Sequence, residues 1–359
     1  TMTHDRHPFT PNSSTSGQAL PPGRQVGLFL FLITLLAIPV LQPLFTRQIS
    51  CGFDTMFHLW RAVQAGALLD EGILFSRWAP HMAHGYGYPL FLYQSPFSAQ
   101  LTAVLHTLNI SWPIALNMVY GLGIIASGWT MWWLVRTFYG NGGGLVAAVA
   151  YLYAPFHAYV VFYRASLSET VAWSLVPLVL WGLYRWQIGR SGWGLGTAVF
   201  SFILLVYTHD VTAYAFLPLF VGWILLWGFR ARSWQTLAQG GLALLLGIGG
   251  SAFFWLPAIA ERSAIQFGRA SSAWPFLYVN NFLPLDQLLA LPRSADPSLL
   301  NDWPPRALGS LLLIMALAGA GLAWRQSARN RWLAGFLLAG LAGYVFLTVS
   351  GSEFLWTAV

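Results

Sequence analysis

The residues best suited to chemistry lie in a short segment after the first long apolar run. This segment, CGFDTMFHLWR, contains a carboxylate, an imidazole and a guanidinium, at Asp54, His58 and Arg61. If the segment is helical, the three lie at positions i, i+4 and i+7 and share one face. The opposite face then carries apolar side chains suited to a lipid or protein surface: Met56, Phe57 and Trp60.

Three further segments place polar groups beside apolar runs: Arg77 with His81, Arg164 with Glu169 in FYRASLSET, and His209 with Asp210 in VYTHDVTAY. A carboxylate there can take a proton from an acceptor hydroxyl or bind a divalent cation. Guanidinium groups can bind a lipid-linked phosphate, and an imidazole can hydrogen-bond it. The catalytic candidates are Asp54, Glu169 and Asp210, with Asp54 also a candidate ligand for Mg²⁺ or Mn²⁺. The substrate-binding candidates are His58, Arg61, Arg77, Arg164 and His209.

Each candidate also has a structural interpretation. Asp54 can cap the helix that follows it, and the SLSE segment can form a capping box around Glu169. The pair His209 and Asp210 can satisfy backbone groups in a tight turn between helices. Arg61 and Arg77 can extend along apolar surface to reach lipid headgroups.

The composition indicates an integral membrane protein. Only 8% of the residues are charged and 57% are hydrophobic, whereas soluble domains carry about 25% charged residues. All 18 basic residues are Arg and are scattered singly between apolar runs, so the positive net charge does not indicate nucleic-acid binding. Cys51 is the only cysteine, which excludes an intrachain disulfide.

The apolar runs predict an all-α protein with about nine transmembrane helices. The first is Val26–Thr46, with the length needed to cross a bilayer. The others are 112–135, 143–163, 168–184, 193–208, 211–229, 236–260, 307–324 and 332–349, separated at one point by the glycine-rich connector Gly140–Gly144. A further helix, Pro96–Asn109, is expected to lie in the membrane interface.

The charges predict the topology. With a cytoplasmic N-terminus, every inner loop carries Arg, as the positive-inside rule requires. Ten of the 11 acidic residues then face outward, and Asp5 alone lies inside. We therefore expect a multi-pass protein of a bacterial inner membrane, with its carboxylate chemistry at the outer face.

The remaining segments define the predicted organisation. Residues 1–24 are predicted to form a flexible cytoplasmic tail. Residues 25–359 are predicted to form one membrane domain with long outer loops at 47–96 and 261–306. The last residues, GSEFLWTAV, end on an apolar segment without a basic or polar finish. That pattern predicts that the natural chain continues beyond residue 359.

Four segments carry a family resemblance: GFDTMFHLWR, RWAPHMAHGYGYPLFLYQSPF, YRASLSETVAWSLVPL and the THD turn. Their order resembles the bacterial membrane proteins called 6-pyruvoyl-tetrahydropterin synthase-related, which are similar to GT-C glycosyltransferases. No residue here indicates pterin chemistry. The resemblance implies that the acid of the first outer loop, Asp54, is catalytic or metal-associated. It also implies a polyprenyl-phosphate sugar donor, bound at the outer face of the membrane.

Three functions follow from these observations as hypotheses. The first is a glycosyltransferase that uses a lipid-linked sugar donor. The second is a non-catalytic subunit of a larger membrane complex, built on the same scaffold and bound to partner membrane subunits. The third is a transporter, which would require two related halves and a site near mid-membrane; the chain shows no internal repeat.

Overall fold

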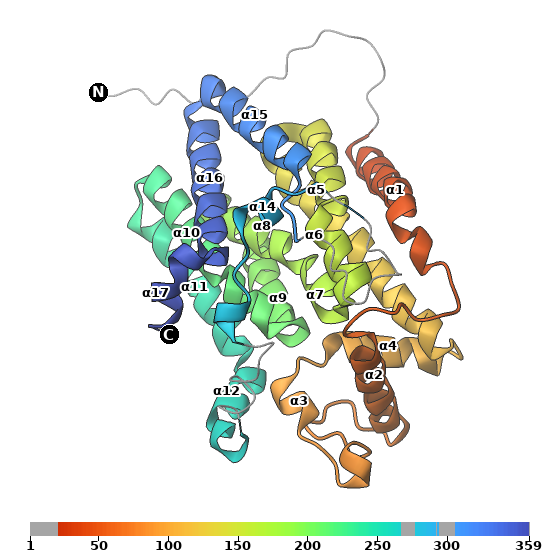
Figure 1. The fold of residues 1–359 in the computed structure, drawn as a ribbon. Helices are drawn as coiled ribbons and strands as arrows, with labels where there is room; N and C mark the ends of the chain where they lie inside the picture. Colours follow the sequence, from red (N-terminus) through yellow and green to blue (C-terminus); the bar gives the residue numbers. More distant parts are fainter. Residues whose placement is uncertain (1–20, 267–276, 292, 294–305, 359) are drawn as a thin grey trace.

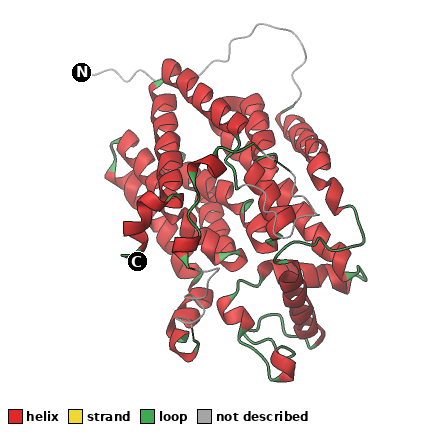
Figure 2. Cartoon of the chain, in the orientation of Figure 1, coloured by secondary structure: helices red, strands yellow, loops and turns green. Residues whose placement is uncertain are grey.

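The computed structural model describes residues 21–266, 277–291, 293 and 306–358, and these residues are all-α (Figures 1 and 2). Within them, the only β-type contact is an antiparallel bridge between Ala79 and Tyr88. The predicted tail lies outside the described residues up to residue 20, and the first helix already begins at Pro22. Half of the second predicted loop, 267–276, 292 and 294–305, also lies outside them.

The longer helices follow the predicted apolar runs. In chain order the α-helices and the π-helix η3 are α1 (Pro22–Leu41), α2 (Thr55–Asp70), α3 (Leu90–Tyr93), α4 (Phe97–Thr107), α5 (Trp112–Leu152), α6 (Pro155–Ala158), η3 (Tyr159–Arg164), α7 (Leu167–Ala172), α8 (Leu175–Gln187), α9 (Gly192–Thr208), α10 (Asp210–Ala231), α11 (Trp234–Gly250), α12 (Ala252–Ala260), α14 (Leu285–Leu288), α15 (Ser310–Gln326), α16 (Ala328–Thr348) and α17 (Glu353–Trp356). The interfacial helix expected over 96–109 is α4.

Among the described residues, five segments are long and apolar enough to cross a membrane: Gly23–Leu44, α5, Leu167–Gln187, α10 and α16. The pair α11–α12, bent by 61°, makes a sixth if it is one span. The nine predicted spans are therefore not confirmed. Two of them, α9 and α15, are apolar but have 17 residues each, about 25 Å of helix against a hydrocarbon core of about 30 Å. Two more fall within α5.

Helix α5 reverses direction at Gly140, whose φ of +71° is accessible mainly to glycine. A Cβ atom at Gly144 would lie 2.9 Å from the carbonyl oxygen of Trp132, and one at Gly128 would lie 3.1 Å from Leu152 Cδ1. Residues 12 and 24 positions apart cannot meet in a straight helix. The predicted glycine connector is therefore where 141–152 folds back along 112–139.

Apolar side chains form two large clusters and a small one. One large cluster joins α8, α9, α10 and α11 around Phe220, Trp223 and Trp227. The other joins α1, both arms of α5 and the start of α7 around Trp132. The small cluster packs α2 against α3 and α4, so the segment 55–107 forms a compact unit at one end of the long helices (Figure 1). This unit brings the beginning of α2 to the long helices.

Candidate functional site

The beginning of α2 has the predicted amphipathic arrangement. His58 and Arg61 are buried, whereas the apolar side chains of the opposite face are exposed: Met56, Phe57 and Trp60. Asp54 occupies the N-cap position, but its side chain makes no capping hydrogen bond. The capping interpretation of this carboxylate is therefore not what the structure shows.

The backbone before α2 pairs with the end of η3, more than 100 residues later. The N–H groups of Phe53 and Asp54 donate to the carbonyl oxygens of Tyr163 (3.0 Å) and Arg164 (2.8 Å). A Cβ atom at Gly52 would collide with the Cβ of Ala165, so this contact requires glycine at position 52. Ala165 itself has a left-handed φ of +56°, and this turn directs the Arg164 side chain toward Asp54.

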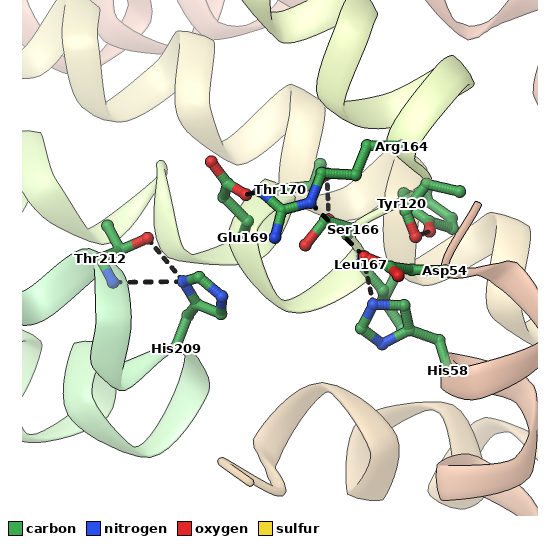
Figure 3. A network of polar contacts seen from close by, with 11 residues as sticks. Asp54, His58, Tyr120, Arg164, Ser166, Leu167, Glu169, Thr170, His209 and Thr212 are labelled. Carbon is green, nitrogen blue, oxygen red and sulfur yellow. Dashed lines mark hydrogen bonds and ion pairs between the residues drawn. The ribbon is translucent and has the colours of Figure 1, made fainter. Parts of the chain in front are cut away.

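Arg164 joins two of the predicted catalytic carboxylates (Figure 3). Its Nε lies 3.5 Å from Asp54 Oδ2, and its Nη1 lies 3.0 Å from Glu169 Oε2. The Glu169 side chain is only 11% exposed, against 27% for Asp54 and 45% for Arg164. One half-exposed guanidinium therefore holds a buried and a partly exposed carboxylate together.

A cavity of about 380 Å³ opens beside this arginine. Its polar lining is formed by His157, Arg164, Glu169, His209 and Thr212, and its aromatic lining by Tyr151, Phe156, Trp173 and Phe216. Asp54 and Asp210 are not among the lining residues. The cavity thus combines one cation, one carboxylate and two imidazoles with a mainly aromatic wall.

His209 lines the cavity and also serves the structural role expected for it. It is the N-cap residue of α10, and its Nδ1 accepts hydrogen bonds from the backbone N–H (3.2 Å) and the hydroxyl of Thr212. Burial, followed by the charges of Arg164 and Arg61, lowers the pKa of His209 to about 4. The ring is therefore neutral near pH 7 and carries its proton on Nε2.

His58 lies beside the same cluster but faces the backbone. Its Nε2 accepts a hydrogen bond from the N–H of Leu167 (3.2 Å), the first residue of α7 (Figure 3). Burial, followed by the charge of Arg61, holds the pKa of His58 well below its usual range. A neutral His58 that accepts at Nε2 positions the start of α7, two residues before Glu169. It does not line the cavity.

Arg61 and Asp210 flank the cluster on the side of α4. The guanidinium of Arg61 donates to Gln94 Oε1 (2.5 Å) and lies 3.8 Å from the centroid of the Phe57 ring. Its buried Nε has no hydrogen-bond acceptor among the described residues. Burial lowers the pKa of Arg61 to about 10, against the opposing charges of Asp54 and Asp210. The Oδ1 of Asp210 lies 3.2 Å from the Ser95 hydroxyl.

The structure does not bring Arg77 into this group. Its guanidinium donates to the carbonyl oxygen of Phe253 on α12 (3.1 Å) and lies 5.7 Å from the Phe75 ring centroid. The predicted divalent cation has no obvious ligand cluster either. Among the described residues, no three His, Cys, Asp or Glu side chains lie close enough together to bind a metal. Mg²⁺ or Mn²⁺ at Asp54 stays a prediction.

His157 lines the cavity but was not among the residues predicted from the sequence. The ring of His157 stacks on Trp173 with centroids 3.6 Å apart and meets the edge of Tyr151 at 4.4 Å. His157 is buried in α6, just before η3. The sequence feature that could have identified His157 is its position two residues after Pro155, as an isolated polar group between two apolar runs.

Comparison with known proteins gives a distant similarity and no family assignment. No family model matches the chain. An uncharacterized protein of Lactococcus lactis subsp. cremoris (strain MG1363) is 24% identical over 240 residues, which cover 64% of this chain and 39% of that protein. The aligned part of the chain thus corresponds to less than half the length of that relative. The chain is therefore similar to part of a longer, uncharacterized bacterial protein.

Proposed function

We propose that this protein is a GT-C-type membrane glycosyltransferase, which moves a sugar from a polyprenyl-phosphate donor to an acceptor hydroxyl. The observation that carries the proposal is Arg164, which holds Asp54 and Glu169 beside an aromatic-lined cavity of about 380 Å³. A guanidinium suits the donor phosphate, a carboxylate suits the acceptor proton, and apolar walls suit the prenyl chain. The order of sequence motifs supports the same assignment.

The proposed topology has nine spans, with the N-terminus on the cytoplasmic side of a bacterial inner membrane. The spans are α1, the two arms of α5, the α7–α8 pair, α9, α10, the α11–α12 pair, α15 and α16. The reversal at Gly140 supports a count of two for α5. The positive-inside rule then places the cavity at the extracytoplasmic face.

In the proposed reaction, the acceptor oxygen attacks the anomeric carbon as the bond from that carbon to the phosphate oxygen breaks. Polyprenyl phosphate leaves with the electron pair, and Arg164 stabilises the charge that develops on it. Glu169 takes the acceptor proton, because it is the carboxylate that lines the cavity. Asp54 orients Arg164 through the 3.5 Å ion pair. None of these steps is routed through a metal.

The position of the ionisable groups favours an enzyme over a transporter. Arg164 is the last residue of η3, Glu169 is the third residue of α7, and Asp210 is the first residue of α10. The groups therefore lie at helix ends, whereas a transporter site is expected near the middle of the membrane. The non-catalytic subunit is the remaining alternative, and the experiment below separates it from the enzyme.

The test is reconstitution of the full chain in lipid vesicles with a panel of polyprenyl-phosphate-linked sugars, measuring release of polyprenyl phosphate. We expect Glu169→Gln to slow release at least about a hundredfold, because it removes the base. Asp54→Asn should slow it as well, through Arg164. Asp70→Asn is the matched control, because Asp70 is exposed at the far end of α2.

Two results would overturn the proposal. Unchanged release in both Glu169→Gln and Asp54→Asn would remove these carboxylates from the reaction. No release by the wild-type chain with any donor, together with co-purification at fixed stoichiometry with other membrane subunits, would establish the non-catalytic alternative.

A further inference from the structure

A second cavity lies between α1 and the first arm of α5, apart from the cavity of the proposed reaction. Its volume is about 470 Å³. Leu41 lines it from the end of α1 and Leu44 from the 3-10 turn that follows (Gln42–Leu44), and Ile114, Met118 and Leu122 line it from α5. In Figure 1, α1 stands at one edge of the molecule. The two helices therefore form an apolar groove, which we call the α1–α5 groove.

One end of the α1–α5 groove is polar and held in place. Asn117, which is buried, donates from Nδ2 to the carbonyl oxygens of Thr46 (3.3 Å) and Gln48 (3.0 Å). These bonds fix the segment that crosses the end of the groove, and Arg47 lies between the two anchored residues. Thr46, Arg47 and Asn117 all line the groove.

Arg47 brings an unpaired positive charge to this end. It is exposed, and no acidic side chain of the described residues forms an ion pair with it. A guanidinium matches a phosphate group in charge and in bidentate geometry. An exposed guanidinium at the end of an apolar groove can therefore hold the phosphate of an anionic lipid.

We propose that the α1–α5 groove is a binding site for an anionic phospholipid. Its acyl chain lies against Leu41, Met118 and Leu122, and its phosphate contacts Arg47. The lining residues indicate the chemical class of the ligand, because an apolar groove that ends at one cation fits an amphiphile with a single negative headgroup. The site is separate from the glycosyl-transfer cavity, and the proposal does not depend on that activity.

Glycine at position 121 keeps the middle of the groove open. A Cβ atom there would lie 3.7 Å from Leu41 Cδ2, an ordinary contact. A larger side chain at this position can therefore be accommodated by the fold while its outer atoms fill the groove. This provides a variant that blocks the hydrocarbon part without changing the charge.

The test is native mass spectrometry of the full chain in detergent, with added phosphatidylglycerol or with phosphatidylcholine of the same acyl chains. Both lipids carry a phosphate, but phosphatidylcholine also carries a trimethylammonium cation that cancels its net charge next to Arg47. Weakening one charge-assisted contact in this way costs about tenfold in affinity. We expect wild type to prefer phosphatidylglycerol by that factor, and Arg47→Gln to remove the preference. Arg24→Gln, at the other end of α1, is the matched control and should keep it. Gly121→Leu should reduce binding of both lipids.

Four results would overturn the proposal. Three are equal affinity of wild type for the two lipids, an unchanged preference in Arg47→Gln, and unchanged lipid binding in Gly121→Leu. Displacement of phosphatidylglycerol by an equal concentration of polyprenyl phosphate would also overturn it, since the groove would then belong to the isoprenoid lipid. No sugar donor is present, so the outcome is independent of glycosyl transfer.

Discussion

Two arginines at the same end of the molecule occupy opposite environments. Arg164 has a 45% exposed side chain and forms ion pairs with two carboxylates. Arg61 is 7% exposed, donates to the neutral Gln94 and leaves its Nε without a partner. The exposed arginine thus has the direct ion pairs, and the buried one has none among the described residues.

The different environments of Arg164 and Arg61 indicate different roles for the two side chains. Ion pairs near water contribute little to stability, so the contacts of Arg164 orient the carboxylates and leave its guanidinium accessible to a ligand. Truncating the buried Arg61 leaves a cavity and removes the donor to Gln94, and both losses are costly. Arg61 therefore supports the packing of α2 against the Gln94 segment, and acts on the site through the field it exerts on Asp54 and Asp210.

The largest expected effect is on stability, at Arg61. Arg61→Ala should lower the free energy of unfolding by about 3 kcal/mol, because it leaves a cavity and an unpaired Gln94 side chain. Arg61→Met fills the same volume without a charge and should cost much less. Chemical unfolding in detergent micelles measures both.

Arg262→Gln is the control for this substitution, because Arg262 is exposed. If Arg61→Ala unfolds at the same denaturant concentration as wild type, the buried arginine has no packing role and the contrast with Arg164 fails.

The second effect is on activity, at Arg164. Arg164→Gln should slow the proposed release of polyprenyl phosphate about a hundredfold, because it removes the group that stabilises the leaving phosphate. The free energy of unfolding should change by less than about 1 kcal/mol, since the ion pairs are partly exposed. Arg164→Lys should recover part of the rate.

A parallel loss of stability and activity in Arg164→Gln would contradict this division of tasks. It would show that the two ion pairs hold the fold rather than the reacting groups.

The effect that is smallest near neutral pH is that of histidine titration. Burial, with the charges of Arg61 and Arg164, lowers the pKa values of His58 and His209 in the folded chain, whereas an unfolded His titrates near about 6.5. Below that pH the unfolded chain binds protons that the folded chain does not. Stability should therefore be constant above about pH 6.5 and fall as the pH drops, by up to about 1.4 kcal/mol per pH unit for each His.

Thermal melting between pH 4 and pH 8 tests this dependence. His58→Gln should make it shallower, because it removes one of the contributing histidines, and His81→Gln, at an exposed position, should leave it unchanged. Identical pH profiles for wild type and His58→Gln would show that His58 is not held neutral by the fold.

Much of the fold could be predicted because its signals are local. The apolar runs and the periodicity of α2 depend on residues a few positions apart, and both appear in the structure. The number of spans was harder to predict, because α9 and α15 are shorter than a bilayer crossing and the two arms of α5 meet directly at the reversal at Gly140.

The candidate site was only partly predictable. The sequence identified the candidate residues but not which of them lie together. Glu169, Arg164 and His209 line the cavity, whereas Arg77 donates to a carbonyl oxygen of α12. His157 was missed, because an isolated histidine between apolar runs resembles an ordinary buried side chain.

By itself, then, the sequence determined a helical membrane protein and the face of α2 that carries Asp54, His58 and Arg61, because hydropathy and helical period act over short distances. Only the tertiary structure decided that Asp54 meets Arg164, 110 positions later. That meeting requires the close approach of Gly52 to Ala165 and the left-handed backbone of Ala165. Such contacts depend on how the helices pack, which no local pattern encodes.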